Sequence, residues 1–424
     1  MTNPHAAATA PRLVGGFMDD RKLARLFAAL DRPGEETRVV GGAIRNALLG
    51  QAVSEIDLAT TASPELVLAC AKEARLKCVP TGIDHGTVTL IVEGTPFEVT
   101  TLREDVETDG RRAKVRFGRD FEADALRRDF TINALSAGRD GHIFDYAGGL
   151  ADLAARRIRF IGSARQRITE DYLRILRFFR FHAAYGEGPM DCEAFAAIIA
   201  ERQGLAQLSR ERVRAELIKL VVARRGPEVA ADCADAGLFG PLFGGIAYPA
   251  RFARLAAIEA ARGTGADALA RIGALAVAIG EDAERLRDRL RLSNDERERL
   301  LQAAIALVPL HGRDRPPAYG QLRVFLFLHG CRAACNGLDL AHAESGAPPD
   351  DPAWMAARRF LEDTPEPRLP FTGADLMARG LPSGRAIGQT LKLLQGLWIR
   401  AGFPEDPAEL ARLIDAALAE QRRQ

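Results

Sequence analysis

The sequence predicts an α+β domain followed by an all-helical remainder. Strand-like segments are concentrated between residues 37 and 162. From Asp171 onward, apolar residues recur at the spacing of amphipathic helices. The chain is also rich in Ala, Leu and Arg, which favour helix. With 424 residues it is long enough for two to four domains.

The first elements form a strand–helix–strand unit around a pair of glycines. A strand is expected to end just before Gly41 and Gly42, where the chain turns. A short amphipathic helix over residues 43–49 follows, and a second strand is expected over residues 54–60, where apolar residues alternate. Glycines at such a turn allow the backbone to approach a phosphate group closely.

The second strand carries two acids that we expect to converge. Residues two apart on a strand face the same side, so Glu55 and Asp57 would aim both carboxylates at one point. Glu98 lies on a later strand candidate and offers a third carboxylate. With Arg45 on the first helical turn, this arrangement suits metal-dependent nucleotidyl transfer. The competing interpretation of these acids is a solvated strand face.

The rest of this domain is expected to contain a helix, further strands and a charged segment. The regular segments are a helix over 64–72 and strands over 77–80, 86–92, 97–102 and 142–146. Residues 103–128 alternate charges densely around a Thr108-Asp109-Gly110 turn and contain few large apolar residues. We predict a mobile loop there, which either closes over a triphosphate or is an inert solvated excursion.

A polar motif, Arg127-Arg128-Asp129, ends this charged segment. Adjacent arginines supply forked donors that fit phosphate oxygens. Asn133 lies one helical turn beyond Asp129 and is a candidate contact for a ribose or a phosphate. Paired arginines are usually solvated, but the apolar residues that follow the motif indicate an anchored segment.

A second arginine-rich motif follows on a predicted helix, where Asp171, Arg174, Arg177 and Arg180 step by three. Residues 154–182 carry eight arginines against two acids, which suits a triphosphate or an RNA backbone.

Asp171 and Arg174 also form a candidate base-reading pair. An arginine that donates to the ring nitrogen and an aspartate that accepts from the exocyclic amine would satisfy cytosine and adenine alike. Guanine and uracil have the opposite polarity, and each buried group left unpaired would cost about 1–3 kcal/mol. The alternative is a salt bridge within the helix, worth about 0.2–0.5 kcal/mol.

The remainder of the chain shows helical periodicity interrupted by Pro and Gly. The expected helices cover residues 171–185, 192–201, 210–223, 250–262, 266–280 and 295–308. A break is expected near residues 345–370, where Pro and acidic residues concentrate.

Whole-chain composition excludes several classes of protein. The 58 basic and 57 acidic residues nearly cancel, so the global charge does not indicate a nucleic-acid partner. No apolar run approaches a membrane span, and the N-terminus lacks the features of a secretory signal. Six cysteines without a Cys-x-x-Cys pair indicate neither a zinc site nor a disulfide framework. We therefore expect a cytoplasmic protein with no membrane partner.

Four motifs, in this order, resemble those of the bacterial class II tRNA nucleotidyltransferases (CCA-adding enzymes) and of the related bacterial poly(A) polymerases. They are Gly41-Gly42-Ala43-Ile44-Arg45, Glu55-Ile56-Asp57, Arg127-Arg128-Asp129-Phe130-Thr131-Ile132-Asn133-Ala134 and Glu170-Asp171-Tyr172-Leu173-Arg174. Residues 209–217 resemble the family's next motif, and residues 371–376 and 384–388 resemble its tail region.

The resemblance implies a polymerase-β-like nucleotidyltransferase head followed by all-α neck, body and tail domains. The implied ranges are 1–25 for an N-terminal extension, 26–162 for the head, 163–225 for the neck, 226–345 for the body and 346–424 for the tail. The implied activity is template-independent addition or repair of the 3′-terminal CCA of tRNA with CTP and ATP. The partners are then these nucleotides and the acceptor end of tRNA, with no obligate protein partner evident.

The resemblance also assigns roles to the motif residues. Glu55 and Asp57 would bind Mg²⁺, expected as two ions, with Glu98 as a further catalytic candidate. The residues expected to bind the nucleotide are Gly41, Gly42, Arg45, Arg127, Arg128, Asp129, Asn133, Asp171, Arg174, Arg177 and Arg180. The same motifs would serve a poly(A) polymerase, an enzyme that adds only CC or only A, or a non-catalytic RNA-binding relative.

The chain departs from the family pattern at three points. Glu55 stands where the family usually has Asp, although it remains an oxygen ligand. Asn46 replaces the more common Asp and removes a charge. No His-Asp dipeptide occurs, so the phosphohydrolase activity of some relatives is not expected.

Overall fold

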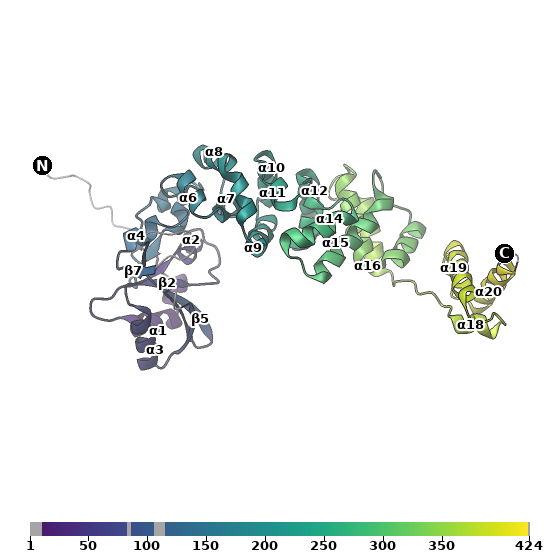
Figure 1. Cartoon of the computed structure of the whole chain (residues 1–424), viewed down its shortest axis with the longest axis horizontal. Helices are drawn as coiled ribbons and strands as arrows, with labels where there is room; N and C mark the ends of the chain where they lie inside the picture. The colour runs from purple at the N-terminus through teal and green to yellow at the C-terminus, as the bar shows by residue number, and fades with distance from the viewer. Residues whose placement is uncertain (1–10, 83–85, 106–114, 423–424) are drawn as a thin grey trace. The chain divides into compact units, whose positions relative to one another are not determined.

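The computed structural model describes residues 11–82, 86–105 and 115–422, and the chain divides into two compact units (Figure 1). Unit 1 comprises Met1–Arg212 and Ala223–Arg225, and unit 2 comprises Val213–Val222 and Gly226–Gln424. The expected Thr108–Gly110 turn and the first ten residues of the expected N-terminal extension lie outside the described residues. The predicted α+β domain followed by helices is confirmed.

Unit 1 contains all strands of the described chain. These are β1 (Thr37–Val40), β2 (Asp57–Thr60), β3 (Lys77–Gly82), β4 (Thr87–Val92), β5 (Thr95–Thr101), β6 (Arg103–Asp105), β7 (Val115–Phe117), β8 (Ser136–Ala137) and β9 (Ile143–Phe144). Its helices are η1 (Gly16–Asp19), α1 (Arg21–Leu30), α2 (Gly42–Leu48), α3 (Pro64–Glu73), α4 (Phe121–Leu126), η3 (Thr131–Asn133), α5 (Gly149–Ala154), α6 (Ala164–Glu170), α7 (Leu173–Tyr185), α8 (Cys192–Glu201) and η4 (Arg202–Gln207).

A seven-stranded sheet with the order β3-β4-β5-β2-β1-β8-β9 forms the centre of unit 1. β2 pairs with β5 in parallel, and the other pairs in this sheet are antiparallel. In this parallel register Asp57 lies opposite Glu98. Phe97 and Val99 on the same strand are buried because alternate residues face the core.

Two amphipathic helices, α1 and α3, lie side by side against the sheet (Figure 1). The N-terminus of α1 is capped by the Asp20 carboxylate, which accepts from the backbone N–H of Lys22 at 2.8 Å. Leu23 and Leu26 of α1 are fully buried, whereas its charged residues face outward. The α3 helix starts with Pro64 after the capping residue Ser63, so it begins where the sequence predicts.

Two local predictions for unit 1 are corrected by the structure, and one strand was missed. The second strand begins at Asp57 rather than at residue 54, so Glu55 lies in the preceding loop and not on the strand. The charged segment is not simply a loop, because β6 pairs with β7 and α4 follows. The β8 strand was not predicted, because two residues are too short to show an alternating pattern.

Packed aromatic rings join the η3 segment to helix α7. The Phe130 ring lies 4.8 Å from Phe160 and 5.3 Å from Phe181, and Phe160 stacks on Phe178 at 5.7 Å. All four rings are buried. Such aromatic pairs contribute roughly 0.5–1.5 kcal/mol beyond the burial of their area. They therefore fix the two predicted arginine motifs relative to each other.

In the described residues of unit 2, all regular elements are helices. Its helices are α9 (Arg210–Val221, which starts in unit 1), α10 (Gly226–Asp235), α11 (Phe239–Phe243), α12 (Pro249–Arg262), α13 (Ala268–Ala276), α14 (Gly280–Leu290), α15 (Asn294–Leu307), η5 (Val308–Leu310), α16 (Tyr319–Glu344), α17 (Pro352–Asp363), α18 (Gly373–Ala378), α19 (Arg385–Arg400) and α20 (Pro407–Gln421). The break expected near 345–370 is shorter than predicted, because α17 occupies much of it and extended chain follows over residues 365–372.

Helix α16 is interrupted at Gly330, where φ is 72° and ψ is 162°. The backbone N–H of Cys331, the first residue after the break, donates to the Glu366 carboxylate at 2.6 Å. This bond satisfies an amide that the interruption would otherwise expose at the start of a new helical segment.

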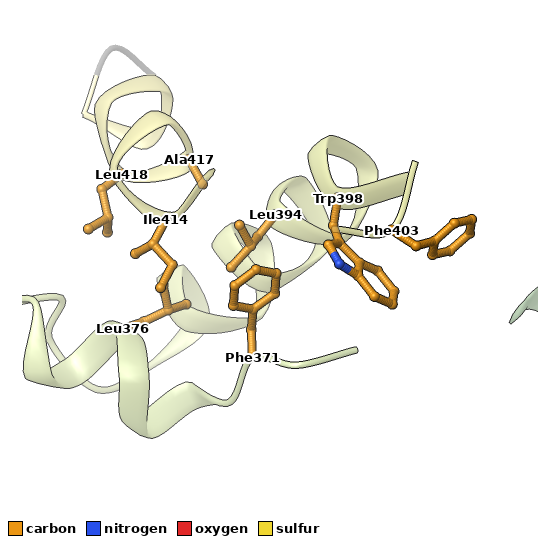
Figure 2. Packing of buried hydrophobic residues seen from close by; sticks show 8 residues of the cluster. All are labelled: Phe371, Leu376, Leu394, Trp398, Phe403, Ile414, Ala417 and Leu418. Carbon is orange, nitrogen blue, oxygen red and sulfur yellow. The ribbon is translucent and has the colours of Figure 1, made fainter. Parts of the chain in front are cut away.

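The last three helices surround an apolar core (Figure 2), and Val324 and Phe327 of α16 also pack against it. Figure 2 shows Ile414 of α20 directed toward Leu376 of α18, and Phe371 directed toward Leu394 of α19. The Trp398 indole N–H donates to the carbonyl of Pro404 at 2.9 Å, so its polar atom is satisfied inside the core. In the part of the chain that the structure describes, no helix is long and apolar enough to cross a membrane.

Candidate active site

A hollow of about 560 Å³ in unit 1 collects the motif residues. Every predicted site residue except Glu98 lines it. They are Gly41, Gly42, Arg45, Glu55, Asp57, Arg127, Arg128, Asp129, Asn133, Asp171, Arg174, Arg177 and Arg180. Motifs that are more than 100 residues apart in the chain therefore meet at one place.

A second cavity, of about 580 Å³, lies among the helices of unit 2. Three of its arginines are paired with acids on its own wall: Arg262 and Arg358 with Asp339, and Arg299 with Asp267. No predicted motif residue lines it, so the hollow in unit 1 is the candidate site.

The acids meet at the start of β2. Asp57 is its first residue and pairs in register with Glu98 of the parallel strand β5, while Glu55 lies two residues earlier. Burial, the charge of Glu98 and the charge of Glu55 raise the pKa of Asp57, and Arg128 opposes this shift. Besides burial, the charges of Glu98 and Glu55 disfavour the ionised form of Asp57, and a bound cation would relieve that repulsion.

These carboxylates fit a metal ion that is shared with a substrate. Across the described residues, no group of three His, Cys, Asp or Glu side chains is arranged to hold a metal ion without other ligands. Mg²⁺ is commonly bound by one or two carboxylates together with substrate phosphates and water. Glu55 and Asp57 on the wall of the hollow match that mode of binding.

The glycine turn brings backbone next to an arginine. Gly41 has a φ of 71°, which non-glycine residues rarely adopt. A Cβ at this position would lie 3.2 Å from Nη1 of Arg128 and 3.6 Å from the carbonyl oxygen of Asn133. The close approach of the turn to the arginine motif therefore also favours glycine here.

Arg127 and Arg128 are both held by Asp124 of α4. Nε and Nη2 of Arg127 donate to one oxygen of Asp124, at 3.0 and 2.5 Å. The same two nitrogens of Arg128 donate to the other oxygen, at 3.3 and 3.1 Å. Sequence reasoning missed Asp124, which the dense charges around it made indistinguishable from a solvated acid.

A chain of buried polar groups connects α2 to α7. Nη1 of Arg45 donates to Oδ1 of Asn133 at 2.5 Å, and Nδ2 of Asn133 donates to Asp129 at 3.1 Å. The other oxygen of Asp129 accepts from Nε of Arg177 at 2.6 Å. Arg45, Asn133 and Asp129 are each 7% exposed, so these bonds replace contacts with water.

Tyr185, at the end of α7, was not predicted and completes this chain. Its hydroxyl oxygen accepts from Nη2 of Arg45 at 2.8 Å, and its ring lies 4.1 Å from the guanidinium carbon. Burial lowers the pKa of Arg45, and Tyr185 opposes the shift. The tyrosine therefore supports the charged form of an arginine that lines the hollow.

The proposed base-reading residues do not form a salt bridge with each other. Asp171 was predicted to lie on one face of the helix. Helix α7 begins at Leu173, so Asp171 precedes the helix and this prediction is wrong. Its oxygens accept from the backbone N–H of Leu173 at 3.1 Å and from Arg212 at 2.7 Å. Arg174 instead donates through Nη1 to Glu170 at 2.5 Å and to the carbonyl of Arg167 at 2.8 Å. The intrahelical Asp171–Arg174 pair is thus not observed.

Four further residues that were given no site role line the hollow: Val40, Leu173, Phe181 and Arg212. Phe181 lies beneath three guanidinium groups, at 4.0 Å from Arg180, 5.2 Å from Arg45 and 5.3 Å from Arg177. In the sequence, Phe181 is indistinguishable from the neighbouring core phenylalanines of α7.

Comparisons with known proteins place these observations in context. The family model of the poly(A) polymerase head domain matches residues 37–159. Mitochondrial CCA tRNA nucleotidyltransferase 1 of Mus musculus is 32% identical over 408 residues, which cover 93% of this chain and 89% of the relative. The CCA-adding enzyme of Levilactobacillus brevis is 37% identical over 224 residues, or 52% of this chain and 55% of the relative. The crystal structure of the Bacillus stearothermophilus CCA-adding enzyme in complex with CTP matches with a TM-score of 0.71 and 26% identity, over 95% of this chain and 99% of that chain.

Proposed function

The chain belongs to the family of CCA tRNA nucleotidyltransferases, and from this premise we propose that it adds or repairs the 3′-terminal CCA of tRNA with CTP and ATP. One observation carries the proposal: the glycine turn, the carboxylates and both arginine motifs meet in one hollow. A site for a single nucleotide beside a metal-binding pair is what stepwise, template-independent addition requires.

In the proposed reaction, the 3′-hydroxyl oxygen of tRNA attacks the α-phosphorus of the bound nucleotide. The new oxygen–phosphorus bond forms as the bond to pyrophosphate breaks, and the hydroxyl proton is released. Glu55 and Asp57 would hold divalent metal, expected as two Mg²⁺ ions, with Glu98 beside Asp57. When bound, the metal lowers the pKa of the attacking hydroxyl and stabilises the charge of the leaving pyrophosphate.

The arginines of the hollow bind and orient the nucleotide in this proposal. Arg127 and Arg128 present guanidinium groups to the phosphates, beside the Gly41 turn that admits them closely. Asn133 is held between Arg45 and Asp129, so its position on the wall of the hollow is fixed. Fixed donors stabilise developing charge without reorganisation during the reaction.

Asp171 and Arg174 would read the base. Within the described residues the hydrogen bonds of the Arg174 guanidinium use Nη1, so Nε and Nη2 remain for the ring nitrogen of cytosine or adenine. Asp171, oriented by Arg212, would accept from the exocyclic amine through its remaining lone pairs. This pairing selects C and A together and leaves groups unpaired with G or U.

The test is incorporation of labelled nucleotides into a tRNA that lacks its CCA end. We expect CTP alone to extend it by two residues, and CTP with ATP to extend it by three. A tRNA that already ends in CC should accept a single A. Long tails made from ATP alone, or no incorporation with any nucleotide, would contradict the proposal.

The division into head, neck, body and tail at the ranges given above belongs to the same proposal. A cytoplasmic location is likewise part of the proposal, whereas the Mus musculus relative is a mitochondrial protein.

A further inference from the structure

We propose that Asp124, through its two carboxylate oxygens, positions Arg127 and Arg128 for the phosphates of the incoming nucleotide. The inference rests on the proposed function, since it concerns how that nucleotide is held. Asp124 is a positioning residue, because it does not line the hollow that both arginines line.

The geometry divides one carboxylate between two guanidinium groups. Arg127 and Arg128 lie three and four residues after Asp124. At this spacing, about one helical turn, both side chains can reach the Asp124 carboxylate. Each arginine uses Nε and Nη2, the edge that matches a carboxylate. Because Nε and Nη2 are bonded to Asp124, the orientation of each guanidinium group is fixed. Its Nη1 then lies on the side that faces away from Asp124. Nη1 of Arg128 lies next to the glycine turn and donates to the carbonyl of Asn133 at 3.3 Å.

The Asp124 carboxylate is buried, and its two arginine partners keep it charged. The Asp124 side chain is 6% exposed, whereas the Arg127 and Arg128 side chains are 30% and 27% exposed toward the hollow. Although burial opposes it, Arg128 and Arg127 hold the pKa of Asp124 below its ordinary value. Asp124 therefore remains ionised throughout the neutral range.

The short helix α4 holds Asp124 in place. Asp120 caps this helix by accepting from the backbone N–H of Glu122 at 2.8 Å, and Phe121 and Ala125 bury its inner face. Asp124 is thus fixed by the fold, and the arginines are fixed by Asp124.

The substitution Asp124→Asn separates these roles, because an amide has one acceptor oxygen and its NH₂ group repels the second guanidinium. At least one arginine is released while side-chain volume is kept. We expect the KM for CTP to rise about 10-fold or more, with kcat changed less than about twofold. Asp124→Glu keeps both oxygens and the charge, so its KM for CTP should lie between that of the unaltered chain and that of Asp124→Asn.

A matched control is available in unit 2. Asp339 likewise binds two arginines, Arg262 and Arg358, and its side chain is 12% exposed. Asp339→Asn removes the same kind of carboxylate from the other unit, where it does not line the hollow, and we expect the KM for CTP to be unchanged.

The outcomes distinguish the inference from the proposed function. If the unaltered chain does not incorporate CMP into tRNA lacking CCA, the proposed function is wrong. If the unaltered chain is active and Asp124→Asn has the same KM as Asp339→Asn, the positioning role is wrong. If Asp124→Asn melts below the assay temperature, Asp124→Glu decides: a KM equal to that of the unaltered chain, despite displaced oxygens, overturns the inference.

Discussion

The substitution Tyr185→Phe tests whether Arg45 is held for nucleotide binding or only for stability. The Tyr185 hydroxyl oxygen accepts from Nη2 of Arg45 at 2.8 Å, and Arg45 is 7% exposed. The substitution removes this acceptor and leaves the ring beneath the guanidinium group. Nη2 of Arg45 keeps one hydrogen bond, to Oδ1 of Asn46 at 3.0 Å, so the guanidinium group loses only part of its support.

The magnitude follows from the kind of bond that is lost. A hydrogen bond to a charged group contributes about 1.5–3 kcal/mol. Because the bond to Asn46 remains, we expect the lower end, about 1.5 kcal/mol, which corresponds to roughly tenfold in an equilibrium constant. If Arg45 serves the nucleotide, this loss appears as a rise of about tenfold in the KM for CTP.

Tyr146 provides a control of the same chemistry in the same unit. Its hydroxyl oxygen accepts from Nη1 of Arg38 at 3.0 Å, and Arg38 is 6% exposed. Neither residue lines the hollow. Tyr146→Phe should therefore cost similar stability without changing nucleotide affinity.

The assay compares both variants with the unaltered chain by initial rates at varied CTP and by thermal unfolding. Both variants should melt a few degrees lower, since about 1 kcal/mol shifts the melting temperature by roughly 2–4 °C for a unit of this size. Only Tyr185→Phe should raise the KM. An unchanged KM for Tyr185→Phe, or an equal rise for Tyr146→Phe, would refute the reasoning.

Three further predictions concern other parts of the chain. Asp57→Asn should reduce incorporation by about 1,000-fold or more while tRNA binding persists. Because the pKa of Asp57 is raised above its ordinary 3.8, the ionised carboxylate destabilises the metal-free fold at neutral pH. The variant should therefore melt at a higher temperature than the unaltered chain in EDTA at pH 8, and this difference should disappear as the pH falls below 3.8. Arg174→Ala should lower incorporation of C and A relative to G and U by about tenfold or more in single-nucleotide assays, and unchanged selectivity would contradict the base-reading role. Gly330→Ala places a Cβ at φ 72° and ψ 162°, which should cost about 1–3 kcal/mol, and an unaltered melting curve would count against strain at this position.

Sequence reasoning succeeded where a local pattern carries the information. The glycine turn, the acids and both arginine motifs were all identified, because each is a short run with its own chemistry. The bounds of their elements were less certain: Glu55 precedes its strand and Asp171 precedes its helix. In both cases the periodic sequence pattern begins before the first residue of the strand or helix, so periodicity alone cannot locate the boundary.

The residues that hold the motifs in place were missed for a different reason. Tyr185 meets Arg45 across 140 positions of the chain, and Arg212 meets Asp171 across 41 positions. Such pairs depend on tertiary packing. The motif at residues 209–217 marks the segment that contains Arg212, but no local pattern identifies Asp171 as its partner, and no local pattern identifies Tyr185. Helix α16 was not among the expected helices, so the break at Gly330 was not predicted either.

The parallel pairing of β2 with β5 has a consequence for the order of folding. Asp57 and Glu98 are neighbours although 41 residues separate them, and the intervening chain contributes α3 and the β3-β4-β5 meander. Local hairpins close early, whereas a parallel contact of this span requires the loop entropy to be overcome first. We expect the mutually repelling acids to come together only in that late step. A partly folded chain would then expose the arginines of both motifs before the carboxylates have come together.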